Sequence, residues 1–241
     1  MELSKITKFS APLLQAWYET PDVRVLRVDA RQSFKPGQFY MVGFEGTNTK
    51  AMSVCSSPTK PFLDFGAKLT GSEHKKKWAS IQPGENVILQ GPYGIFTLQE
   101  QEKKICMIAG GIGITPFLSY LQYALDEQLD NDFVLLYSNK TLQDRAFSKE
   151  FLKMEQETKE SGGPCKIKII ETLTREPEGN GWNGLRGRIN KETFLKEVPD
   201  AAERLHYICG VPDMVKGLAA TLAELGVDKK RVKKEEFTGL H

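Results

Sequence analysis

Closely spaced cysteines are the first thing that this sequence lacks. Its four cysteines, Cys55, Cys106, Cys165 and Cys209, are scattered, and no two stand at the C-x-x-C spacing of metal or redox pairs. This argues against an iron–sulfur cluster held by cysteine ligands and against structural zinc, so no metal site is expected. We expect the four thiols to behave as buried small hydrophobic groups.

A strong net charge and a long apolar run are also absent. The chain has 33 basic and 31 acidic residues, a formal net charge of +2, so it lacks the global field of a nucleic-acid-binding protein. No apolar stretch approaches the length of a membrane span, and Met1–Lys5 lack the apolar core of a signal peptide. We therefore expect a cytoplasmic protein without a nucleic-acid partner or a membrane span. Its 241 residues suffice for one large domain or two modest ones, and we expect two.

The most informative stretch runs from Lys104 to Leu125. A short apolar run ends in a turn with three glycines, Gly110, Gly111 and Gly113, and apolar residues then recur at helical spacing. This pattern predicts a strand, a turn and a helix, with Thr115 capping the helix and Pro116 in its first turn.

Such a turn suits a dinucleotide. Glycines allow positive φ angles and close approach of a ligand to the backbone, and a helix N-terminus attracts a pyrophosphate. The match to G-x-G-x-x-G is incomplete, since Pro116 stands where the third glycine is usual, and a purely structural turn is the alternative.

The first half of the chain predicts an antiparallel β domain, either a barrel or a sandwich. Short apolar or alternating runs are separated by Pro-Gly turns at Lys35-Pro36-Gly37 and Gln82-Pro83-Gly84. A closed barrel would leave no exposed edges among so many short strands. The expected strands are Val23–Val28, Gln38–Phe44, Phe62–Leu69 and Val87–Leu89.

Two loops of this β domain stand out. Lys50–Pro58 mixes hydroxyls with small side chains, which suits hydrogen bonding to a flat polar heterocycle. Gly91–Phe96 places two glycines around an aromatic residue. Taken alone, each loop is equally well explained as an ordinary turn.

The second half of the chain alternates strands with helices, which predicts a parallel sheet covered by helices on both faces. Ligands of such sheets lie at the carboxyl ends of the strands. We expect a domain boundary between residues 99 and 100. After the glycine turn, the expected strands are Asp132–Ser138, Lys166–Leu173, Leu205–Cys209 and Arg231–Phe237, and the expected helices are Asp144–Lys159 and Met214–Leu225.

Three motifs together resemble the ferredoxin–NADP reductase-like family of flavoproteins: K-x-M-S-x-x-S from Lys50, G-P-Y-G-x-F from Gly91 and G-G-x-G-x-T-P from Gly110. The resemblance covers nearly the whole chain in the family's domain order. It implies a flavin-binding antiparallel barrel followed by an NAD(P)-binding α/β domain. Further matches are the W-x-G and G-R-I segments at Trp182 and Gly187.

The resemblance also implies roles for residues of the barrel. Lys50, Met52 and Ser53 fall at the arginine, tyrosine and serine of the family's R-x-Y-S, and the serine is expected near flavin N5. Lysine keeps the positive charge but lacks the bidentate fork of arginine, while methionine offers a polarizable thioether in place of an aromatic ring. The resemblance favours FAD over FMN. The further flavin candidates are Ala51, Val54, Gly91, Tyr93, and Gly71 and Ser72 at a predicted helix start.

The run Lys75-Lys76-Lys77 follows that helix start. It is read either as part of an anion site or as a solvated face, which is the commoner use of such a run.

Residues of the second domain are implied in binding the nicotinamide dinucleotide. The end of the second strand carries cations and no acid before Asp144, which favours NADPH over NADH. Cys209 to Met214 matches the family's C-G-x-P-x-M turn beside the nicotinamide, with a buried strand-end cysteine as the alternative. The candidates are Gly110, Gly111, Gly113, Thr115, Pro116, Ser138, Asn139, Lys140, Arg145, Cys209, Gly210 and Met214.

The acidic-aromatic ending Glu235–Gly239 also matches the family. There Phe237 is expected either to cover the flavin or to fill the seam between the domains. Together with Ser53 and Cys209, it completes the set of catalytic candidates.

The resemblance implies hydride transfer from NAD(P)H to flavin N5, followed by delivery of electrons to a separate acceptor such as a ferredoxin, a flavodoxin or an oxygenase component. The alternatives are an electron-transfer subunit of a larger complex, a flavin, quinone or ferric reductase, and a dinucleotide sensor without redox activity. Such chemistry needs no general acid or base, so His74, His206 and His241 are expected to be surface or packing residues.

Overall fold

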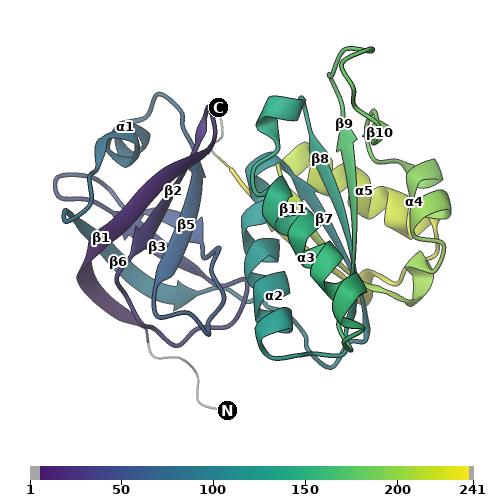
Figure 1. The fold of residues 1–241 in the computed structure, drawn as a ribbon, viewed down its shortest axis with the longest axis horizontal. Coiled ribbons are helices and arrows are strands. Elements are labelled where there is room, and N and C mark those ends of the chain that lie inside the picture. Colours follow the sequence, from purple (N-terminus) through teal and green to yellow (C-terminus); the bar gives the residue numbers. More distant parts are fainter. Residues whose placement is uncertain (1–5, 239–241) are drawn as a thin grey trace. The chain divides into compact units, whose positions relative to one another are not determined.

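The computed structural model describes residues 6–238, so residues 1–5 and 239–241, Gly239 and His241 among them, lie outside the described residues. The chain forms two compact units, residues 6–98 with 115–126 and residues 99–114 with 127–238 (Figure 1). The helices are α1 (Glu73–Ser80), α2 (Thr115–Asp126), α3 (Ser148–Ser161), α4 (Lys191–Glu197) and α5 (Pro212–Glu224). Helix α2 groups with the first unit, and the domain boundary between residues 99 and 100 stays a prediction.

The first unit is a six-stranded antiparallel sheet in the order β4-β3-β6-β1-β2-β5. A bridge between Val54 and Phe65 joins its two edges, so the sheet is a nearly closed barrel, which confirms the predicted fold class. The strands are β1 (Thr7–Thr20), β2 (Val23–Val28), β3 (Phe39–Gly43), β4 (Lys50–Ser53), β5 (Leu63–Lys68) and β6 (Asn86–Tyr93).

The barrel interior is apolar and almost fully buried. Val28, Tyr40 and Phe65 are each 0% exposed. Burying an aliphatic or aromatic side chain of this size contributes about 1.5–3 kcal/mol, so this core is the main source of the unit's stability.

Two features of the barrel differ from the sequence prediction. Strand β1 begins at Thr7, whereas the first strand expected from the sequence is Val23–Val28, and Lys50–Ser53 is a strand rather than a loop. Both segments are held by pairing with distant strands, since β1 pairs with β6 and β4 pairs with β3. Local sequence patterns do not reveal such partners.

Helix α2 is fastened to the segment that follows β4. Ser119 donates from Oγ to the Ser56 carbonyl at 2.7 Å, and the Ser57 N–H donates to the Gln122 side chain at 3.1 Å. Tyr120 donates its hydroxyl to the Phe96 carbonyl at 2.8 Å. These bonds fix the ends of both loops that the sequence singles out.

The second unit is a parallel sheet in the order β10-β9-β8-β7-β11-β12. One face packs against α4 and α5, as the shared core of Ile108, Phe194 and Leu218 shows. On strand β8, Tyr137 meets Phe151 of α3 at 6.3 Å. The strands are β7 (Lys104–Gly110), β8 (Asp132–Asn139), β9 (Lys166–Leu173), β10 (Leu185–Arg186), β11 (Leu205–Gly210) and β12 (Val232–Glu236).

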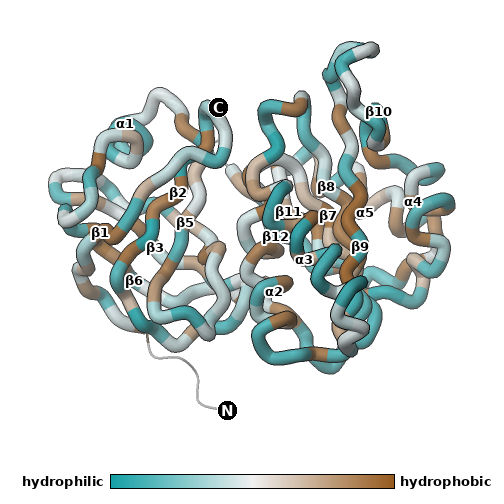
Figure 2. Tube along the Cα trace, in the orientation of Figure 1, coloured by the Kyte–Doolittle hydropathy of each residue, from teal (hydrophilic) through white to brown (hydrophobic). Residues whose placement is uncertain are grey.

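Every expected strand of this unit is found, and its inner strands carry hydrophobic segments of the trace (Figure 2). Helix α3 begins at Ser148 rather than Asp144, because Leu142–Asp144 forms a separate 3-10 turn that Thr141 and Asp144 cap reciprocally. Helix α4 was not predicted. Across residues 6–238, none of the helices is both long and apolar enough to cross a membrane.

Candidate cofactor-binding sites

Strand β4 displays the residues expected to meet a flavin. Lys50 and Ala51 are exposed, whereas Met52 is 9% and Ser53 6% exposed. In a strand, alternate side chains share a face, so Lys50 and Met52 lie on one side and Ser53 on the other. The structure thus groups the lysine with the methionine, and the contact of Ser53 with flavin N5 stays a prediction.

The start of α1 is open to a ligand. Ser72 is the N-cap, as predicted, and its hydroxyl accepts a bond from the Lys75 N–H at 3.4 Å. Gly71 is exposed, and a Cβ built on it would meet no atom within 4 Å. The free space and the positive end of a helix dipole fit a phosphate group.

Only one lysine of the run in α1 lacks a carboxylate partner. Lys76 pairs with Glu73 and Lys77 pairs with Glu85, each at 2.8 Å. Lys75 forms no ion pair within residues 6–238. Lys76 and Lys77 therefore fit the interpretation of this run as a solvent-exposed helix face, and Lys75 does not.

Two of the remaining flavin candidates of the barrel, Val54 and Gly91, have packing roles. Val54 is fully buried in the core. A Cβ on Gly91 would lie 2.6 Å from the Tyr40 ring, so glycine is required there by the barrel itself. Tyr93 is half-buried, and its hydroxyl accepts a hydrogen bond from Gln90 Nε2 at 2.7 Å. Contact of Tyr93 with the flavin stays a prediction.

The glycines after β7 have separate functions in the fold. A Cβ on Gly110 would lie 2.3 Å from the Met214 sulfur, and one on Gly113 would lie 2.5 Å from the Cys209 carbonyl oxygen. Gly111 has a φ of +51° and would meet nothing within 4 Å. Gly110 and Gly113 therefore serve packing, and Gly111 alone leaves open space for a dinucleotide.

The predicted helix cap in this turn is wrong. Residues 111–114 form a 3-10 helix, and Thr115 is already the first residue of α2, with Pro116 second. Thr115 is 1% exposed, so its side chain is part of the packed interior. The helical turn begins at Gly111 because the glycine there adopts the positive φ angle that enters it.

The C-G-x-P-x-M segment is a packed strand end followed by α5. Cys209 is fully buried, and burial raises the pKa of its thiol well above the usual value, so the sulfur stays a neutral packing group. The Met214 sulfur would also lie 3.2 Å from a Cβ on Gly210. Phe237 donates its N–H to the Gly210 carbonyl at 2.8 Å, which brings the last aromatic residue to this turn.

The end of β8 provides fewer free cations than the sequence implied. Arg145 forms a two-pronged ion pair with Glu171, whose other partner is the Ser148 hydroxyl. The guanidinium also lies over the Trp182 ring, 4.7 Å from its centre. Lys140 is exposed and has no ion-pair partner within the described part of the chain. Ser138 and Asn139 are the last two residues of β8, and Asn139 is 5% exposed.

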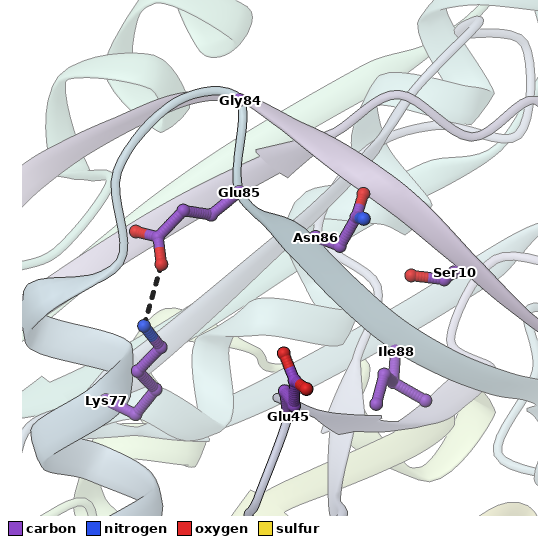
Figure 3. A pocket seen from close by; sticks show the side chains of 7 residues that line it. All are labelled: Ser10, Glu45, Lys77, Gly84, Glu85, Asn86 and Ile88. Atoms are coloured by element: carbon purple, nitrogen blue, oxygen red, sulfur yellow. Dashed lines mark hydrogen bonds and ion pairs between the residues drawn. The ribbon is translucent and has the colours of Figure 1, made fainter.

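Figure 3 shows the side chains that line a depression in the barrel unit. Two of them, Lys77 and Glu85, form an ion pair at 2.8 Å. None of the predicted cofactor residues lines it, so we assign it no role. Its lining residues are Ser10, Glu45, Lys77, Gly84, Glu85, Asn86 and Ile88.

Comparison with known proteins gives a family match in the second half of the chain and relatives that align with most of it. Residues 107–220 match the family described as the oxidoreductase NAD-binding domain. The sulfhydrogenase 1 subunit gamma of Pyrococcus furiosus is 32% identical over 203 residues, which cover 80% of this chain and 65% of that protein. The glycine betaine monooxygenase reductase subunit of Chromohalobacter salexigens is 27% identical over 230 residues, which cover 91% of this chain and 61% of that protein. The chain thus spans under two thirds of the length of these relatives.

Solved structures share the fold. The Amycolatopsis cytochrome P450 reductase GcoB superposes with a TM-score of 0.85 at 19% identity, covering 98% of this chain and 72% of its own. A ferredoxin NADP+ reductase from Neisseria gonorrhoeae with bound FAD and NADP has a TM-score of 0.78 at 22% identity. The match covers 95% of this chain and 98% of that chain.

Proposed function

We propose that the chain is an NAD(P)H-dependent flavoprotein reductase of the ferredoxin–NADP reductase-like family; the match to an oxidoreductase NAD-binding domain and the shared fold support this proposal. FAD is the expected resident cofactor and a nicotinamide dinucleotide the electron donor. A bound flavin supplies the ability to accept a hydride and to pass its electrons onward. The observation that carries the proposal is a pair of separate ligand-compatible sites, one at β4 and α1 of the barrel and one at Gly111 of the α/β unit.

The protein's own residues bind and orient the cofactors. In the barrel unit, Lys50 and the start of α1 supply positive potential for the flavin phosphates. In the α/β unit, Gly111 exposes its backbone to the dinucleotide. The neutral thiol of Cys209 and the apolar Met214 make an unreactive, water-excluding wall, which suits hydride transfer because no proton has to be moved there.

We expect Ser53→Ala to slow flavin reduction about tenfold while leaving FAD content unchanged. The hydroxyl is proposed to hydrogen-bond near the reacting nitrogen, and one hydrogen bond of about 1–1.5 kcal/mol corresponds to about a factor of ten in rate. Stopped-flow reduction by NADPH measures the effect, with Ser10→Ala, at the depression of Figure 3, as the control. An unchanged rate in Ser53→Ala would remove Ser53 from the proposed site.

For the electron donor we propose NADPH, whose 2′-phosphate would be recognised by Lys140. Arg145 is engaged by Glu171, so Lys140 is the cation left for a 2′-phosphate at this strand end. We expect Lys140→Met to lower kcat/KM for NADPH about two- to fivefold, the range for one exposed charge pair, and to leave NADH unaffected. Lys149→Met, an exposed lysine of α3, is the control. Equal effects on both nucleotides would contradict the assignment.

For the acceptor we propose a separate electron-transfer protein in the cytoplasm, such as a ferredoxin, a flavodoxin or an oxygenase component. Similarity to a monooxygenase reductase subunit supports this choice. The second candidate is an electron-transfer subunit of a larger complex, which similarity to a sulfhydrogenase subunit favours.

The activity test is ferricyanide reduction by the FAD-loaded chain with NADPH or NADH. Turnover is expected from the isolated chain, because ferricyanide takes electrons directly from a reduced flavin. Turnover together with a native mass of a single chain would favour the separate reductase over the complex subunit. No turnover from FAD-loaded protein would contradict the reductase function.

A further inference from the structure

Three basic groups, Lys50, His74 and Lys75, gather where α1 meets β4, and the two lysines among them carry positive charge. Burial lowers the pKa of His74, and the positive charges of Lys75 and Lys50 act in the same direction. Burial also lowers the pKa of Lys75, with a further contribution from the charge of Lys50. Within residues 6–238, neither lysine has a carboxylate partner. Such a cluster is self-repulsive until an anion joins it.

Lys75 is held over the barrel rather than extended into water. Its Nζ lies 3.9 Å from the Met52 sulfur and 5.4 Å from the centre of the Trp78 ring, and the residue is half-buried. Lys75 and Trp78 are three positions apart on α1, so they share one helix face. Because Trp78 is fully buried, this is the face that packs on the barrel.

The charged neighbours of this face are already engaged. His74 is 4% exposed, and its Nε2 lies 2.9 Å from the Val42 carbonyl oxygen that accepts its proton. On β5, which contacts α1, Lys68 pairs with Asp22 at 2.7 Å. The carboxylates of Glu73 and Glu85 are held by Lys76 and Lys77. These three carboxylates are thus held by other lysines, and none of them neutralises Lys75.

We propose that Lys75 is a phosphate-binding residue of the flavin site and acts with Lys50 as a two-lysine clamp. This inference rests on the proposed function, since it presupposes a flavin at β4. A lysine is a point charge and cannot grip a phosphate bidentately as arginine does, so a second ammonium group restores the lost contact. Lys75 supplies it from a partly desolvated position, where a charge-assisted bond is stronger than in water.

The clamp predicts that flavin affinity falls at alkaline pH. Burial and the charge of Lys50 lower the pKa of Lys75 to about 8 in the flavin-free protein. A bound phosphate favours the charged form and raises that pKa. Affinity is therefore fully present below pH 8 and is lost as the pH rises above it, by about tenfold between pH 7 and pH 9.

The test compares FAD with riboflavin, which has the same ring system but no phosphate. Apoprotein of the full chain is titrated with each flavin, and binding is followed by quenching of flavin fluorescence. Lys75→Met is expected to weaken FAD binding about tenfold or more, as for loss of one charge-assisted hydrogen bond, with riboflavin binding unchanged. Lys75→Arg should keep FAD affinity near that of the wild type, and Lys76→Met, whose lysine is exposed and paired with Glu73, should change neither.

The outcomes distinguish failure of the lysine clamp from failure of the proposed flavoprotein function. If the wild type binds FAD and Lys75→Met binds it equally well, the clamp is wrong and the flavoprotein function stands. Equal loss of FAD and riboflavin in Lys75→Met would also overturn the clamp, because the lysine would then act on the ring or on the fold. If the wild type binds neither flavin, the proposed function itself fails and the clamp fails with it. A flat pH profile for wild-type FAD binding from pH 7 to pH 9 would contradict the clamp.

Discussion

Gly113→Ala is expected to destabilise the protein by about 3 kcal/mol, at the upper end of the cost of inserting a methyl group into a packed interior. The added Cβ would lie 2.5 Å from the Cys209 carbonyl oxygen and 2.9 Å from the Gly210 N–H nitrogen. Both atoms belong to β11, which is hydrogen-bonded to β7 and β12 on its two sides. Because a central strand has little freedom to move, the clash should be relieved only by distorting the glycine turn. Urea unfolding of the purified protein measures the effect.

Gly111→Ala is the matched control, since it adds the same methyl group two positions away. A Cβ there meets no atom within 4 Å, although the φ of +51° imposes a smaller cost of about 1 kcal/mol. This variant should fold and should bind NADPH more weakly, because the methyl group fills the open space assigned to the dinucleotide. Equal stability losses in the two variants would show that the contact with β11 does not set the need for Gly113.

Arg204→Met is expected to cost about 3–5 kcal/mol, the range for breaking a buried ion pair by removing one partner. The Arg204 side chain is 6% exposed, donates from Nε to Asp200 at 2.7 Å and from Nη2 to Asp132 at 3.1 Å. It also donates from Nη1 to the Ile105 carbonyl at 3.4 Å, so it ties two strands and the turn before β11 together. Thermal and urea unfolding should both shift.

Lys104→Met provides the comparison for Arg204. Lys104 pairs with the same Asp200, at 3.1 Å, and with Glu203 at 2.6 Å, but its side chain is 42% exposed. Solvent screening makes such a pair weak, so its removal should change stability far less than removal of Arg204. If the two variants lost equal stability, the burial of Arg204 would not be the cause of its contribution.

The parts of the fold that follow from local chemistry were predictable. The strand, glycine turn and helix from Lys104 onward depend on glycine, proline and apolar spacing within one window, and the structure has them in that order. The start of α1 at Ser72 is a local cap and was also found. All four cysteines are buried, as expected from their isolation in the sequence.

Features that depend on distant partners were not predictable. Strand β4 forms because β3 lies beside it, although hydroxyl and small residues suggested a loop. Arg145 looked like a free cation, but its partner Glu171 is 26 positions away.

The sequence does not distinguish the three lysines of α1, Lys75, Lys76 and Lys77. Only the packing of the helix shows that Lys76 and Lys77 form ion pairs with carboxylates, whereas Lys75 forms none with the described residues. A signal was present in the three-residue spacing between Lys75 and Trp78, which places the lysine on the buried face of the helix.

We propose that a nicotinamide dinucleotide reduces a flavin held by this chain. The direct measurement is an anaerobic titration of the FAD-loaded protein with NADPH and with NADH, followed in the visible spectrum. We predict a flavin absorption band that bleaches on addition of the donor, with NADPH effective at lower concentration. Protein that remains colourless after incubation with FAD or FMN, or a flavin band that neither nucleotide bleaches, would contradict the account.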